Sequence, residues 1–155
     1  MNQSDRESLA ESLYSGIDYV AGRRGNVNLG SPILDALIVM HDRLSITVML
    51  FMAAIGVWGL LLYVRGNGVT GSFAGALVIG ELLVIVQVVA GVLLFAGGAR
   101  PPTATHYLYG ITAILVLPFA WSYFKDRSQR QALMIYSLLA LFIFGLAVRG
   151  MVTGS

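Results

Sequence analysis

The sequence predicts an all-α integral membrane protein: an up-down-up-down bundle of four transmembrane helices, preceded by an amphipathic helix on the membrane surface. Two observations predict this class. Of the 155 residues, 57% are hydrophobic and only 12% are charged, a composition typical of a chain whose solvent is mostly lipid. The apolar residues also form four long runs, and an α-helix satisfies every backbone hydrogen bond of such a run inside hydrocarbon.

Each apolar run is long enough, or nearly so, to cross a hydrocarbon core of roughly 30 Å. The links between them are short, so neighbouring helices are expected to be antiparallel. Ser31 and Pro32 are typical of a helix start, which places His41 in the first transmembrane helix, just ahead of its apolar run. The expected spans cover about 35–64, 72–97, 104–124 and 132–151.

Residues 1–31 differ from the rest and are predicted to form an extramembrane segment, with residues 32–155 forming the transmembrane domain. The stretch "SDRE" at 4–7 fits a capping box. Apolar residues then recur at helical spacing from Leu9 to Val20. We expect a short amphipathic helix on the membrane surface; a solvated tail is the alternative.

Composition also limits the partners, the cofactors and the location. A net charge of +2, with no basic patch interleaved with aromatics, predicts no nucleic-acid partner. The absence of cysteine excludes disulfides, thiolate metal sites and iron–sulfur clusters. Basic residues in the 125–131 loop favour a cytoplasmic loop, and therefore both termini outside, in a plasma membrane of prokaryotic type. The bilayer is then the main partner, beside a second copy or other subunits of a membrane complex.

The chain has two histidines, His41 and His106, and the predicted topology brings them to the same end of the bundle. The first and third helices run in the same direction, and each histidine lies near the start of its apolar run. The second and fourth helices run the opposite way. They therefore deliver Gln87, Gly91 and Arg149 to that same end.

Two histidines at equal depth, with small residues such as Gly110 on the same helical stripe, form an arrangement that a b-type haem requires. His41 and His106 would supply the axial nitrogens to the haem iron, and Asp35 and Thr105 are candidate acceptors for their other ring N–H groups. Each histidine alone could instead cap a helix or lie among the headgroups. The haem propionates would need cations at this face, and the candidates are Arg43, Arg100 and Arg149, which could also be snorkelling anchors.

Glu81 lies within the second apolar run, where a charge is costly. It could handle protons, bind a quinone, stay a neutral hydrogen-bonded acid or contact a partner subunit. Its helical spacing places it on a different stripe from Gln87. Pro118 is expected to kink the third helix.

Three stretches resemble parts of the haem A synthase family: "GELLVIVQVVAGVLLFAGGARPPTATHYLYGITAILVL" (80–117), "MHDRLSITVMLFMAAIGVWGL" (40–60) and "FGLAVRG" (144–150). The resemblance covers roughly residues 35–150 and implies a four-helix bundle with haem between the first and third helices, held by His41 and His106. The family carries two such bundles, whereas this chain has one. It also lacks a glutamate three residues before His41.

The leading hypothesis is therefore a membrane protein that binds haem b and takes part in electron transfer or haem-linked redox chemistry. Whether it is an enzyme is left open. The main alternative is a small structural subunit of a respiratory or photosynthetic membrane complex without a cofactor of its own. Chlorophyll bound through one histidine and a proton or ion transporter built around Glu81 are further alternatives.

Overall fold

The fold was analysed in a computed structural model, which describes residue 11, residues 31–124 and residues 126–154. Residues from Leu34 onward form one compact unit. The predicted amphipathic N-terminal helix falls on residues that lie outside the described part of the chain. The described helices are α2 (Ser31–Val64), α3 (Gly71–Ala96), α4 (Thr105–Phe124) and α5 (Gln129–Gly154).

All four of these helices are long and apolar enough to cross a membrane. This confirms the predicted helical class and the number of apolar helices within the described residues. Their bounds differ from the expected spans by at most four residues: α2 begins at Ser31 instead of 35, and α5 extends three residues further at each end, from Gln129 to Gly154. Polar residues at both ends of α5 extend the helix beyond its apolar run, because apolar patterning marks the buried part of a helix better than its ends.

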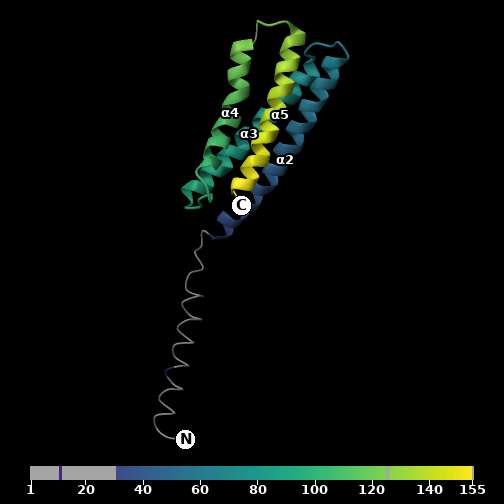
Figure 1. The fold of residues 1–155 in the computed structure, drawn as a ribbon. Helices are drawn as coiled ribbons and strands as arrows, with labels where there is room; N and C mark the ends of the chain where they lie inside the picture. The colour runs from purple at the N-terminus through teal and green to yellow at the C-terminus, as the bar shows by residue number, and fades with distance from the viewer. Residues whose placement is uncertain (1–10, 12–30, 125, 155) are drawn as a thin grey trace. The chain divides into compact units, whose positions relative to one another are not determined.

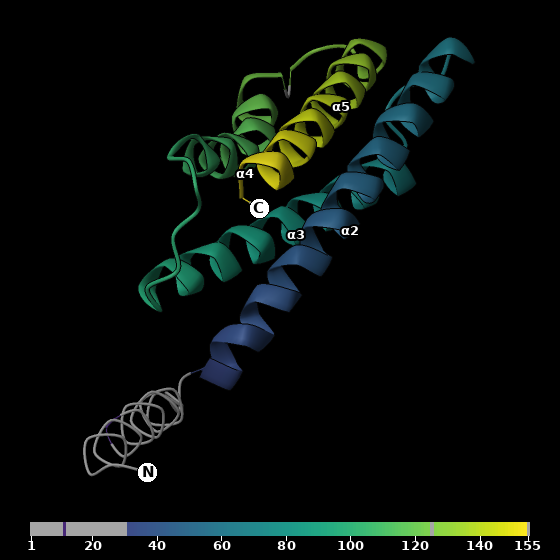
Figure 2. The ribbon, with the colours of Figure 1, turned by 60° about the horizontal axis from the view of Figure 1, so that its bottom comes forward.

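The four helices alternate in direction (Figure 1), with the α2–α3 and α4–α5 links at one end and the α3–α4 link and the end of α5 at the other. Figure 2 shows the same helices from a second direction, with α4 beside α5. Short links produce this antiparallel order, since a link of a few residues leaves the next helix only the return direction.

Local sequence signals set the ends of α3. The Thr70 hydroxyl accepts a hydrogen bond from the Phe73 N–H at 3.2 Å, which caps the first turn. At the other end the Gly97 N–H donates to the Leu93 carbonyl, and Gly98 adopts a positive φ of 95°. That backbone conformation favours glycine and stops the helix, so the chain turns toward α4.

The core lies where small residues let α2, α3 and α5 approach one another closely. A Cβ added at Gly59 would lie 2.6 Å from the Phe73 ring and would also meet the Ser137 side chain. At Gly56 it would lie 2.6 Å from the Leu141 side chain. Glycine at both positions therefore permits these contacts, as small residues do between membrane helices. The largest fully buried side chains are Phe73, Met52, Leu133, Ile143 and Ser137.

The links at the end of the bundle opposite the histidines are joined to each other. The Val69 N–H donates to the Gln129 carbonyl at 3.3 Å, which ties the α2–α3 link to the start of α5. The Arg130 guanidinium lies 5.0 Å from the centre of the Tyr63 ring, a cation–π distance. These contacts fix one end of the bundle and leave the histidine end to be held by contacts of its own.

Candidate functional site

The structure brings the two histidines together. The ring centroids of His41 on α2 and His106 on α4 lie 6.1 Å apart, with the ring planes at 56°. Both side chains are half-buried. Val48 and Met52, on the same face of α2 as His41, are buried in the core, and so is Leu117, on the same face of α4 as His106. The depth match inferred from topology therefore corresponds to an actual side-chain pair.

His106 is held by the end of α5. Its Nδ1 lies 3.0 Å from the Gly150 carbonyl oxygen. A carbonyl can only accept, so Nδ1 carries the proton and, in a neutral ring, Nε2 keeps its lone pair. The Thr103 hydroxyl adds a second link between the same elements, donating to the Thr153 carbonyl at 3.2 Å.

His41 has a different environment, formed by α3. The Gln87 amide nitrogen lies 3.3 Å from the His41 Nε2. The His41 Nδ1 and the Gln87 Oε1 are buried and have no hydrogen-bond partner among the described residues. Gly91 lies beside the ring, where an added Cβ would be 3.3 Å from the His41 Cε1. Gln87 thus contacts His41 directly, and Gly91 approaches its ring closely. Both are predicted site residues.

The acceptors expected for the ring N–H groups are not the ones present. The predicted acceptor Asp35 is exposed, and the Thr105 hydroxyl donates to the Thr103 hydroxyl at 3.1 Å. The acceptor for His106 is instead the Gly150 carbonyl. Residue type does not reveal a backbone acceptor, because every residue has a carbonyl group. The antiparallel order of the helices could still have pointed to it, because that order places the end of α5 beside the start of α4.

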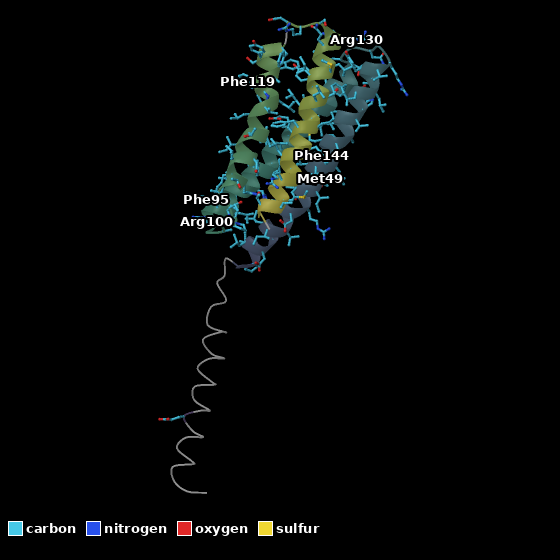
Figure 3. All side chains as sticks on the ribbon, in the orientation of Figure 1. Met49, Phe95, Arg100, Phe119, Arg130 and Phe144 are labelled. Carbon is cyan, nitrogen blue, oxygen red and sulfur yellow. The ribbon has the colours of Figure 1, made fainter. Side chains whose placement is uncertain are left out.

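The three predicted arginines have different surroundings. Arg43 and Arg149 are exposed on α2 and α5. Arg100 is hydrogen-bonded to the backbone: its Nη1 donates to the carbonyls of Phe95 at 2.6 Å and Ala99 at 2.9 Å. The guanidinium also lies 3.8 Å from the centre of the Phe95 ring, and Figure 3 shows both labelled side chains at the same end of α3. Arg100 therefore completes the end of α3, as a basic side chain can do at a helix C-terminus.

Gly110, the remaining predicted residue, could accept a methyl group without a clash. An added Cβ there would find its nearest neighbour, the Val88 side chain, at 3.9 Å. A glycine that the sequence analysis did not single out has the opposite surroundings. A Cβ at Gly154 would lie 2.7 Å from the His106 Cε1 and 2.8 Å from its Nδ1. Gly154 thus allows the end of α5 to close over the ring.

Glu81 and the surface of α4 lie outside the histidine site. Both carboxylate oxygens of Glu81 are buried without a hydrogen-bond partner among the described residues, so the hydrogen-bonded acid considered for it has no partner within that part of the chain. An open apolar groove of about 510 Å³ lies along α4 and contains none of the predicted site residues. It is lined by Ile111, Thr112, Leu115, Val116, Pro118 and Phe119.

The two imidazoles fit the requirements of an axial pair. A metal ion lies about 2 Å from an imidazole nitrogen, and the radius of each ring then separates two axial centroids by about 6 Å. Two axial rings can take any angle about their common axis, so 56° between their planes is compatible with this role. Within the described residues, no group of three or more His, Cys, Asp or Glu side chains is placed to hold a metal ion.

We compared the chain with protein-family models, with curated proteins and with solved structures, and none of them matches it. The resemblance to haem A synthases stays a prediction from the quoted stretches of sequence.

Proposed function

We propose that this chain is an integral membrane protein that binds haem b between α2 and α4 and transfers electrons. The single observation that carries the proposal is the pair of imidazoles with centroids 6.1 Å apart. These are the only two histidines in the sequence, and they come from two different helices. Fixed tautomers and ring orientations distinguish ligands from incidental interfacial histidines, and His106 already has such a fixed orientation through Gly150.

The surface of the helices supports a membrane location. Large apolar side chains are exposed on all four helices, among them Leu50, Leu82, Leu115 and Phe142. Apolar surface of this extent is unfavourable in water and favourable in hydrocarbon. We infer a plasma membrane of prokaryotic type, with the 125–131 loop on the cytoplasmic side because that loop holds a cluster of basic residues.

The residues at the site would have different roles in binding the haem. His41 and His106 would hold the iron, and Gly110 is a small residue one turn from His106, where an added Cβ would come into ordinary contact with Val88. Arg43 and Arg149 are exposed and available to the propionates. Arg100 would have to leave the α3 carbonyls to join them. Haem held by two imidazoles supplies one-electron chemistry, because its iron cycles between the ferrous and ferric states.

The test is an absorbance spectrum of the full chain purified in detergent after expression with added haem precursor. We expect a Soret band and sharp α and β bands on reduction. His41→Ala and His106→Ala should each reduce bound haem at least tenfold, because a single axial ligand remains. Tyr109→Phe, on the same helix as His106, is the matched control and should keep the spectrum.

Two measurements keep this test decisive if a variant folds poorly. Circular dichroism and size-exclusion elution show whether each variant keeps its helices and its size. Added imidazole should restore the spectrum of His106→Ala, because it supplies the missing ligand. A colourless wild-type protein would contradict the proposal. If that colourless protein also co-purifies with stoichiometric membrane subunits, the structural-subunit alternative is favoured instead.

A further inference from the structure

The hydrogen bonds around the two histidines differ in a way that decides which nitrogen of each ring is free. His106 uses Nδ1 for the Gly150 carbonyl, which leaves Nε2 for a ligand. His41 uses Nε2 for Gln87, which leaves Nδ1. That Nδ1 is buried and has no partner among the described residues. The free atoms are therefore Nε2 on one ring and Nδ1 on the other.

The contact between Gln87 and His41 can be made in two ways. The amide oxygen and nitrogen of glutamine exchange places when the end of the side chain turns by half a rotation, so either atom can face the imidazole. If the amide N–H donates to His41 Nε2, a neutral ring carries its proton on Nδ1. If the amide oxygen accepts from the Nε2–H, the Nδ1 keeps its lone pair.

Only the second arrangement leaves His41 able to bind a metal from its present position. In the first, one ring nitrogen is occupied by the amide donor and the other by a proton. In the second, the unpartnered buried Nδ1 is a lone pair that a metal ion can take. The other ring nitrogen, Nε2, then donates its proton to the Gln87 amide oxygen. Metal-binding imidazoles usually donate their second N–H to an acceptor in this way.

We propose that the Gln87 side-chain oxygen accepts the His41 Nε2–H and thereby presents the His41 Nδ1 to the haem iron. Gln87 is then a positioning residue for this ligand. The two axial ligands use different nitrogens, Nδ1 of His41 and Nε2 of His106. This inference rests on the proposed haem-binding function, but it makes a claim about the histidine rings that can be measured without haem.

Gly91 gives an independent reason to assign the Nδ1 edge to a ligand. A Cβ at this position would lie 3.3 Å from the His41 Cε1 and 3.9 Å from its Nδ1. The glycine therefore lies beside the edge of the ring that carries the buried Nδ1, and a side chain at this position would crowd that edge. Close backbone approach to a ligand is a common reason for glycine on a helix.

The first experiment is nitrogen-15 NMR of the full chain in detergent micelles without haem, with labelled histidine. We expect His41 to carry its proton on Nε2 and His106 to carry it on Nδ1. Gln87→Met should weaken the hydrogen bond of the His41 Nε2–H, seen as an upfield proton shift and faster exchange with water. Gln87→Glu keeps an acceptor and should preserve the bond. A proton on His41 Nδ1 in the wild-type protein would overturn the inference.

The second experiment uses the ferrous haem-loaded protein, whose six-coordinate iron is diamagnetic. The His41 Nε2–H signal should persist when haem is bound, because the iron takes Nδ1. Loss of that signal on loading would show that Nε2 is the ligand and would overturn the inference while leaving haem binding intact. Failure of the wild-type protein to bind haem would instead overturn the proposed function, whichever tautomer the haem-free protein shows.

Discussion

The His106 imidazole donates from Nδ1 to the Gly150 carbonyl at 3.0 Å, and this bond ties the start of α4 to the end of α5. The same carbonyl accepts a weaker bond from the Thr153 hydroxyl at 3.3 Å. The end of α5 thus does two things at once: it closes one end of the bundle, and it orients a side chain that the proposed function places on a metal.

The end of α5 leads to a first prediction. Gly154→Ala should push the His106 ring away from Gly150, because the new Cβ would lie 2.7 Å from the His106 Cε1. We expect a weaker His106 Nδ1–H hydrogen bond in NMR and a small loss of stability, because Gly154 is itself exposed and only the His106 ring must move. The matched control is Gly145→Ala, since that site has nothing within 4 Å. Equal behaviour of the two variants would contradict the close approach of Gly154.

A second prediction concerns the contact among α2, α3 and α5. Gly59→Ala should lower the thermal stability in detergent, because the methyl group would enter the space of the Phe73 ring and Ser137. The expected loss is about 1–3 kcal/mol. Gly75→Ala, at a helical site with nothing within 4 Å, should keep or raise the melting temperature. If Gly59→Ala melts like the wild type, these helices pack less closely than described.

Glu81 provides a third prediction. Its carboxylate oxygens are buried without a partner among the described residues, and an unsatisfied buried polar group costs about 1–3 kcal/mol. Glu81→Leu should therefore raise the melting temperature of the purified protein. Asp126→Asn, in the exposed α4–α5 link, is the control and should change stability by less than about 0.5 kcal/mol. A destabilised Glu81→Leu protein would mean that the carboxyl has a favourable interaction.

The fourth prediction separates a structural arginine from those available to a cofactor. Arg100→Ala removes one hydrogen bond to Phe95 at the end of α3, one to Ala99 in the link that follows, and the contact with the Phe95 ring. It should reduce stability by about 1–3 kcal/mol whether or not haem is present. Arg149→Ala removes an exposed side chain and should leave the stability of the haem-free protein unchanged while weakening haem binding. Loss of haem affinity without loss of stability in Arg100→Ala would reverse these assignments.

Apolar run lengths alone determined the number of membrane-length helices in the described part of this protein, because hydrocarbon accepts only segments that satisfy their own backbone hydrogen bonds. Short links determined their antiparallel order. Helical periodicity also fixed which residues share a face with His106, among them Gly110. The depth match of the two histidines is a consequence of these constraints.

Only the tertiary structure decided which groups contact the histidines. The partner of His106 is the backbone carbonyl of Gly150, and residue type does not identify a backbone partner. Arg100 turned out to bind the end of its own preceding helix, because a flexible side chain takes the nearest unsatisfied carbonyls. The pairing of Gln87 with His41 depends on the rotation of α3 about its own axis. That rotation is set by packing against the neighbouring helices, and periodicity within a single helix leaves it undetermined.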